Sequence, residues 1–173
     1  IDLFFMLLTV AGNETTRNLI SHGMHALMEH PDQYAMLRND PLLVDSAVEE
    51  MLRWASPVMH FRRTASRDCE IGGQAIAEGD KVVIWYISAN RDETVWDDPF
   101  TFDITRQDNQ HVSFGGGGPH FCLGANLARM EARVMFDEII KRFEVIEPAG
   151  DCQRLRSNFI NGIKHLPVRV KPA

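Results

Sequence analysis

The sequence predicts a mainly α fold with small β-sheets, and three long segments with helical character carry that prediction. Apolar and helix-forming residues extend from the start to about His30, from about Leu43 to Ser56, and from Cys122 to about Arg142. Between and after these segments lie short runs rich in β-branched and aromatic residues. With 173 residues, 45% of them hydrophobic, the chain can bury one core of domain size.

The helical segments have recognisable ends. Pro31 stops the first one, and a short helix is expected from Pro31 to Asn39, where Asp40-Pro41 breaks it. The next helix has an apolar stripe at helical spacing, formed by Val44, Ala47, Val48, Met51 and Leu52.

The predicted strands are short and are separated by turns that contain glycine. Turns are expected at Gly72-Gly73 and at Glu78-Gly79-Asp80. The strands are, in order, Val58–Thr64, Cys69–Ile71, Lys81–Ile87, about Glu144–Ile146 and Val168–Val170. No helix or strand is predicted from Arg91 to Phe121, and a loop of this length inside a domain needs another source of order.

Charge and composition exclude several classes of function. The formal net charge of −6 argues against a surface that binds nucleic acid. The apolar run from Leu3 to Gly12 is too short to span a bilayer, so no membrane segment is expected in this part. Three cysteines, Cys69, Cys122 and Cys152, form no disulfide framework, which fits a reducing, cytoplasmic location.

The most informative segment runs from Phe114 to Gly124 and reads FGGGGPHFCLG. Four consecutive glycines cost conformational entropy, so the backbone there must do what other residues cannot. Helix formers follow from Ala125, so Cys122 is expected at a helix N-terminus, where N–H groups and the helix dipole stabilise a thiolate. A single soft thiolate on such a loop is typical of an axial ligand to haem iron. The alternative is an inert, buried structural cysteine.

This loop resembles the haem-ligand loop of the cytochrome P450 family, and two earlier segments resemble other motifs of that family in the same order. Ala11-Gly12-Asn13-Glu14-Thr15-Thr16 is similar to its oxygen-activating segment, and Glu50-Met51-Leu52-Arg53 to its Glu-x-x-Arg pair. The resemblance implies the cytochrome P450 fold from the long central helix through the haem-ligand loop and the final helix. Residues 1–173 would then be the C-terminal part of a single domain, with the N-terminal part absent.

The implied cofactor is haem b, with Cys122 as the metal ligand. The bound haem would also order the long loop before Cys122, for which no helix or strand is predicted. Gly118 has the usual place in the family pattern, but the family's phenylalanine stands one position closer to the cysteine than Phe114 does. Some bacterial members have a similar longer loop. The resemblance also counts Phe114, Gly118 and Gly124 among the cofactor contacts.

Haem carboxylates need cationic or hydrogen-bonding partners. The resemblance assigns this role to Arg63, with Arg62 as the fallback, and to His120. The alternatives are a solvated strand residue for Arg63 and a turn residue for His120. His22 and His25 share a helix face, but they are expected to be surface residues rather than metal ligands.

The resemblance implies that dioxygen binds beside the long helix. Gly12 costs about 1 kcal/mol relative to alanine inside a helix, and a local bulge there, next to Ala11, would open a groove for dioxygen. Glu14 and Thr15 would be the catalytic pair: Thr15 holds the dioxygen and a water, and Glu14 relays protons from solvent. The alternatives are a solvated charge for Glu14 and a hydroxyl bonded back to its own helix for Thr15.

Glu50 and Arg53 lie on one helix face and can pair. The resemblance implies a buried network that also includes Arg106 and that assembles the haem pocket. The alternative is an exposed ion pair that contributes little to stability.

Two mainly apolar segments are expected to face a hydrophobic substrate together with residues of the long helix: Pro57–Phe61, after the Glu-x-x-Arg helix, and Phe159–Gly162, near the C-terminus. Ordinary core packing is the alternative for each residue. The C-terminal segment from Leu155 to Pro167 is similar to that of bacterial members that hydroxylate sterols, methyl-branched lipids or terpenoids. The expected pocket residues are Phe5, Leu8, Val58, Met59, Phe159 and Ile160.

The resemblance therefore implies a bacterial haem-thiolate monooxygenase that uses O₂ and electrons from a ferredoxin or similar donor to hydroxylate an unactivated C–H bond. Arg129 and Arg133 are candidate donor contacts, or else part of a solvated helix face. Alternative functions are a peroxide-driven haem enzyme, a non-catalytic haem-binding protein and an inactive fragment. The Glu14-Thr15 pair disfavours the first two, because neither peroxide chemistry nor sensing needs a proton relay.

Overall fold

The computed structural model describes residues 1–173 and confirms a mainly α fold with small β-sheets. The helices are α1 (Asp2–Glu29), α2 (Pro31–Asn39), the 3₁₀ turn η1 (Pro41–Leu43), α3 (Val44–Ala55), α4 (Tyr86–Ala89) and α5 (Ala125–Arg142). The strands are β1 (His60–Thr64), β2 (Cys69–Ile71), β3 (Gln74–Ile76), β4 (Lys81–Trp85), β5 (Phe143–Pro148), β6 (Gln153–Arg154), β7 (Ile163–His165) and β8 (Val168–Pro172).

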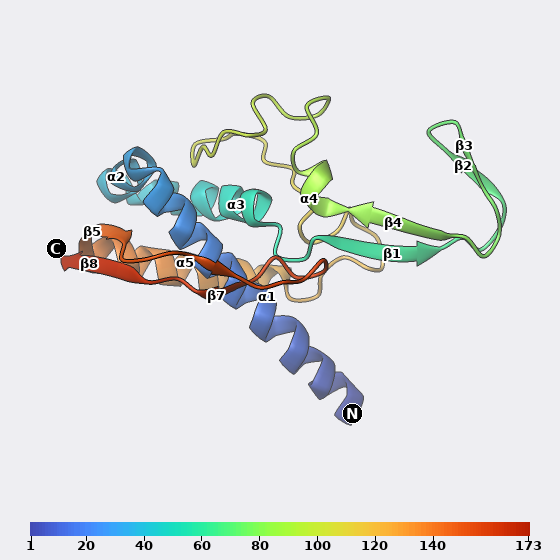
Figure 1. Ribbon diagram of the computed structural model, residues 1–173, viewed down its shortest axis with the longest axis horizontal. Helices are drawn as coiled ribbons and strands as arrows, with labels where there is room; N and C mark the ends of the chain where they lie inside the picture. The colour runs from blue at the N-terminus through green and yellow to red at the C-terminus, as the bar shows by residue number, and fades with distance from the viewer.

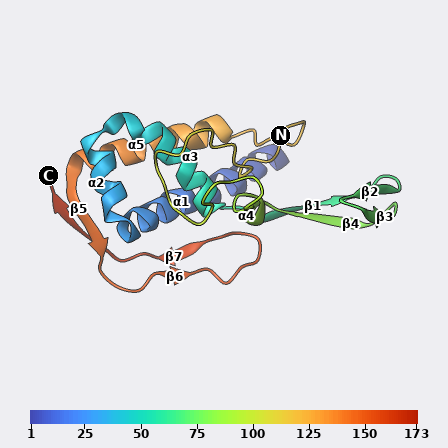
Figure 2. The same ribbon diagram turned by 90° about the horizontal axis from the view of Figure 1, so that it is seen from above.

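The strands form four separate antiparallel pairs: β1 with β4, β2 with β3, β5 with β8, and β6 with β7. In Figure 1 the β1–β4 ribbon extends away from the helices and carries the β2–β3 hairpin at its end. Figure 2 shows α1 between the helices α3 and α5 on one side and the β6–β7 hairpin on the other. The C-terminal part of α1 thus packs against α3 and α5 as well as β7, while its N-terminal part stands free of the other elements (Figure 1).

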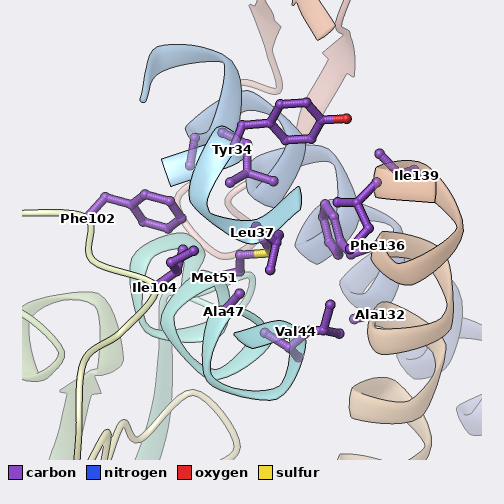
Figure 3. Packing of buried hydrophobic residues seen from close by; sticks show 14 of the residues in the cluster. Tyr34, Leu37, Val44, Ala47, Met51, Phe102, Ile104, Ala132, Phe136 and Ile139 are labelled. Carbon is purple, nitrogen blue, oxygen red and sulfur yellow. The ribbon is translucent and has the colours of Figure 1, made fainter. Parts of the chain in front are cut away.

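The core lies where α1, α2, α3 and α5 meet (Figure 3). The apolar stripe predicted for α3 is buried throughout, as are Leu37 of α2 and Phe136 of α5. Helix α1 approaches closely because Gly23 has no side chain: a Cβ there would lie 2.6 Å from the Met51 sulfur and 2.7 Å from the Phe136 ring. The core therefore fixes α1 and α5 relative to α3.

Some predicted boundaries were wrong. The strand expected to end at Ile87 stops at Trp85, because Tyr86 begins the short helix α4. The last helix begins at Ala125, with Gly124 as its N-cap, so Cys122 lies in the turn before the helix and not at its first residue. The strands β3, β6 and β7 were not predicted; each has only two or three residues.

The N-terminal part of α1 is exposed, including the apolar side chains of Phe5 and Leu8, which are 60% and 43% exposed. None of the helices combines the length and the apolar character that crossing a bilayer requires.

Candidate functional site

One cavity of about 310 Å³ brings together residues from distant parts of the chain. It lies between α1, the residues after α3, β1 and the glycine-rich loop. Most of its lining is apolar, with a cysteine, an arginine and a histidine added. Its lining is Ala11, Thr15, Thr16, Leu19, Leu52, Pro57, Val58, Phe61, Arg63, Tyr86, Ser113, Phe114, His120, Cys122 and Ala128.

Seven of the residues predicted from the sequence line this cavity: Ala11, Thr15, Val58, Arg63, Phe114, His120 and Cys122. The others do not line it, namely Phe5, Leu8, Gly12, Glu14, Met59, Gly118, Gly124, Phe159 and Ile160. Sequence reasoning missed Leu19, which follows Ala11 and Thr15 at helical spacing, so that spacing could have identified it. Tyr86 and Ser113 gave no comparable signal.

The glycine-rich loop presents Cys122 to the cavity. The Cys122 N–H donates to the Phe114 carbonyl at 3.0 Å, which closes the loop on itself. Gly117 and Gly118 have φ angles of 94° and 75°, a left-handed conformation that residues with a side chain rarely adopt. The cysteine thiol is exposed and free, so it is available to a ligand.

The donor set fits a haem group. Cys122 offers one thiolate, and the apolar lining suits a large planar ring. Arg63 makes no ion pair and donates only to the Arg62 carbonyl at 3.1 Å, so its guanidinium can bind a haem carboxylate, as can the His120 ring. Arg62 does not line the cavity. A Cβ at Gly12 or Gly124 would meet no atom within 4 Å, so neither position is packed against protein.

Helix α1 forms the wall that carries Ala11 and Thr15. The bulge predicted at Gly12 is not present, because α1 is a continuous α-helix there and nothing packs against Gly12 to displace the backbone. Thr15 Oγ1 donates to the Ala11 carbonyl at 2.7 Å. Glu14 points away from the cavity and pairs with Arg17 at 2.6 Å on the helix surface.

Glu50 and Arg53 form a buried ion pair, and both side chains are 0% exposed. Arg53 Nε and Nη2 each donate to a Glu50 carboxylate oxygen at 2.7 Å. Arg53 also donates to three backbone carbonyls of the long loop, those of Asn90, Pro99 and Thr101. The pair is therefore a centre around which the loop is folded.

Further loop residues bind the same carboxylate. Glu50 accepts hydrogen bonds from the Asp103 N–H and from the Asn109 side chain, both at 3.0 Å. Arg106 Nε lies 3.3 Å from Glu50 Oε2, too poorly aligned for a hydrogen bond, while its terminal nitrogens donate to carbonyls of residues 97, 98 and 101. The segment between α4 and α5 is ordered by side chains instead of by secondary structure.

Neighbouring Glu49 makes a second ionic cluster. Its carboxylate accepts from Arg129 Nε at 2.6 Å and Nη2 at 2.9 Å, and lies 3.0 Å from His111 Nε2. Burial raises the pKa of Glu49, but hydrogen bonds from His111 and Arg129 outweigh it and lower the pKa to about 2. Arg129 is thus bound within the protein, and Arg133, on the next turn of α5, pairs with Asp45.

The two segments predicted to face substrate lie side by side. The Met59 N–H donates to the Phe159 carbonyl at 2.9 Å, and Val58 forms an isolated β-bridge with Ile160. The rings of Phe61 and Phe159 pack edge to face with centroids 5.6 Å apart. In the first segment Pro57, Val58 and Phe61 line the cavity, whereas no residue of the second segment, 159–162, does.

The prediction that His22 is a surface residue was wrong. Its side chain is buried, and Nε2 lies 2.9 Å from the Asn161 carbonyl, which requires that nitrogen to donate. The pKa of His22 is lowered from 6.5 to about 4, chiefly by burial and in smaller part by the charges of Arg154, His25 and Arg91, while the Asn161 hydrogen bond acts in the opposite direction. The neutral ring therefore connects α1 to the segment before β7.

We expect stability to fall as the pH decreases from 6.5 towards 4, because the unfolded chain takes up a proton on His22 in this range and the folded chain does not. The change is about 3 kcal/mol over the window. Urea unfolding at pH 7 and pH 4.5 measures it: His22→Gln reduces the difference between the two pH values, whereas His25→Gln on the same helix keeps it. An unchanged difference in His22→Gln contradicts this assignment.

The family model, the sequence relatives and the solved structures that match this chain all point to the same protein family. The family model described as "Cytochrome P450" matches residues 1–170. The chain is 55% identical over 166 residues to the methyl-branched lipid omega-hydroxylase of Mycobacterium tuberculosis strain H37Rv, covering 95% of this chain and 39% of that protein. It is 53% identical to the linalool 8-monooxygenase of Pseudomonas putida, covering 94% of this chain and 40% of the relative.

The steroid C26-monooxygenase of Rhodococcus jostii is 49% identical, with 98% of this chain and 36% of that protein covered. Among solved structures, a cytochrome P450 of Mycobacterium marinum in complex with pseudoionone superposes with a TM-score of 0.92 at 49% identity, over 95% of this chain and 40% of that one. The chain thus spans about two fifths of the length of these relatives.

Proposed function

The chain belongs to the cytochrome P450 family, and from that premise we propose that its protein is a haem-thiolate monooxygenase acting on a hydrophobic substrate. The observation that carries the proposal is the meeting of Cys122, Arg63 and His120 with Ala11 and Thr15 around one largely apolar cavity. The expected cofactor is haem b. The overall reaction consumes RH, O₂, two electrons and two protons, and yields ROH and H₂O.

Five of the residues predicted from the sequence would have distinct parts in this reaction. A haem bound here would supply the activation of O₂ and its insertion into a C–H bond. The Cys122 thiolate would hold the group by its metal, and Arg63 and His120 would bind its carboxylates. On the α1 wall of the cavity, the Thr15 hydroxyl would hold a water once it turns from the Ala11 carbonyl. Glu14, exposed on the helix surface, exchanges protons with solvent.

The apolar lining favours a substrate without charge in the part that is oxidised. Relatives that are about half identical are named for methyl-branched lipids, linalool and steroids. We infer a sterol, a branched lipid or a terpenoid as the substrate class. Electrons would come from a ferredoxin or a similar donor on the face of Cys122, and the three free cysteines fit a reducing, cytoplasmic setting.

Turnover of the full-length gene product tests this function. We expect hydroxylated product with NADPH or NADH, a ferredoxin and its reductase, on a panel of sterols, branched fatty acids and monoterpenes, with one oxygen from ¹⁸O₂ in the product. Product only with added peroxide would favour a peroxide-driven enzyme. A haem spectrum without product under any condition would favour a binding protein.

Thr15→Ala is expected to lower product formation by about a hundredfold while electron consumption continues and hydrogen peroxide accumulates, because the hydroxyl that guides protons is lost. The matched control is Thr9→Ala. Thr9 also lies on α1 and donates to the carbonyl four residues before it, at 2.9 Å, but it is outside the cavity. Equal ratios of peroxide to product in the two variants would contradict the role of Thr15, which Thr15→Ser should largely retain.

A further inference from the structure

The ring of Phe114 lies against two side chains that both bind Glu49. The Arg129 guanidinium carbon lies 4.6 Å from the centre of the Phe114 ring, and the His111 ring lies 5.9 Å from it. Both partners are fixed by the Glu49 carboxylate, Arg129 through two hydrogen bonds and His111 through one. One carboxylate on α3 therefore positions the aromatic residue of the glycine-rich loop.

Phe114 is in turn joined to Cys122. Its carbonyl accepts the Cys122 N–H at 3.0 Å, and both residues line the cavity. The His111 ring also accepts the Ser113 N–H at 3.2 Å, which fixes the backbone just before Phe114. If Arg129 or His111 moved, Phe114 would move with it and would shift the backbone of Cys122.

Arg129 is connected to Cys122 through Phe114, whose ring lies 4.6 Å from the guanidinium carbon and whose carbonyl accepts the Cys122 N–H. The pKa of Arg129 is raised by its hydrogen bond with Glu49 and further by the charges of Glu49 and Cys122, against the effect of burial. The side chains of Glu49 and Arg129 are each 28% exposed, so solvent screens them only in part. The Arg129 cation is therefore held by the Glu49 carboxylate against the ring of Phe114, the residue that binds the Cys122 backbone.

We propose that Glu49 and Arg129 are positioning residues that set the charge felt by the Cys122 thiolate, and thereby the reduction potential of the haem it binds. This inference rests on the proposed haem-thiolate function. Reduction adds an electron to the haem and its thiolate, so a nearby cation favours the reduced form. The Glu49 carboxylate offsets the positive charge of Arg129. The reduction potential therefore depends on the balance between these two charges.

The proposal predicts opposite shifts from two substitutions in one ion pair. Glu49→Gln leaves the Arg129 cation without its counter-charge and raises the potential. Arg129→Gln leaves the carboxylate alone and lowers it. Each changes the ratio of reduced to oxidised haem at a fixed electrode potential by about three- to tenfold. The double variant Glu49→Gln/Arg129→Gln restores neutrality and returns near the original value.

A structural contact alone would not produce this pattern. Loss of packing between α3 and α5 would move all three variants in one direction or leave the potential unchanged. Asp45→Asn is the matched control, because Asp45 and Arg133 form the neighbouring ion pair between the same two helices. We expect no shift from it, because Arg133 and Asp45 are 51% and 69% exposed, so solvent screens their charges, and neither of them contacts Phe114.

Spectroelectrochemical titration of the haem-loaded, full-length gene product at pH 7 measures these potentials, with the carbon monoxide spectrum recorded for each sample. Opposite shifts for the single variants, with recovery in the double variant, support the inference. A thiolate-type spectrum with potentials that do not differ from the parent, or that shift in the same direction, overturns this inference alone.

The absence of a thiolate-type spectrum in the unmodified protein overturns the proposed function and this inference with it. If Arg129→Gln does not take up haem, Glu49→Gln and Arg129→Lys decide the matter. The first should still raise the potential, and the second, which keeps the charge, should leave it close to the parent value. If the reduction potential rises in both Glu49→Gln and Arg129→Lys, or in neither of them, the inference is overturned.

Discussion

Cys122→Ser is expected to abolish the thiolate-type Soret band of the reduced carbon monoxide complex, together with all monooxygenation. A serine hydroxyl is not deprotonated at neutral pH and gives the metal no soft anionic ligand. The loop itself should persist, because the contact that closes it is the backbone hydrogen bond from residue 122 to the Phe114 carbonyl. The loss would therefore reflect chemistry at one atom and leave the fold intact.

The comparison variants are Cys69→Ser and Cys152→Ser. Both cysteines are free and neither lines the cavity, so each variant should keep the parent spectrum. Difference spectra of the full-length gene product, with haem content and circular dichroism measured in parallel, check the result. A thiolate-type band that survives in Cys122→Ser, or disappears in Cys152→Ser, would show that another residue binds the metal.

Arg53→Met is expected to lower the free energy of unfolding by about 3–5 kcal/mol. The substitution leaves the Glu50 carboxylate buried without its bidentate partner. It also removes the donor to the carbonyls of Asn90, Pro99 and Thr101. Buried groups that lose their partners cost more than the net gain of an average hydrogen bond.

Urea unfolding followed by circular dichroism measures this loss. Arg142→Met is the control, because Arg142 pairs with Glu138 at 2.6 Å on an exposed face of α5, with 69% and 45% of the two side chains accessible. Such a surface pair contributes about 0–1 kcal/mol. If the two arginine variants lose similar stability, the buried network is not what holds the long loop.

The helices could be predicted from the sequence because their signals are local. Pro31 and the apolar stripe of α3 fixed two helices to within a residue or two of their observed ends. The short helix α4 could not be predicted, because residues 81–87 have β character throughout. Tyr86 leaves the strand where its N–H donates to the Met59 carbonyl, a partner far away in the sequence.

The site was predictable only where a motif marked it. The loop around Cys122 and the segment around Thr15 each have a recognisable pattern, and the structure places both on one cavity. Glu49 gave no signal, because its partners Arg129 and His111 are brought to it by the packing of α3 against α5 and the loop. His22 was misassigned for the same reason, since the Asn161 carbonyl that it binds lies near the other end of the chain.

The way Arg53 holds the long loop has a consequence for how this segment tolerates change. Its guanidinium binds backbone carbonyls, which every amino acid carries, and not the side chains of residues 90, 99 and 101. Sequence variation at positions 99 and 101 should therefore have little effect as long as the backbone path is kept. Selection on this part of the protein would fall on Glu50 and Arg53 and on the loop side chains that contact Glu50, those of Arg106 and Asn109, while positions 99 and 101 would remain free to diverge.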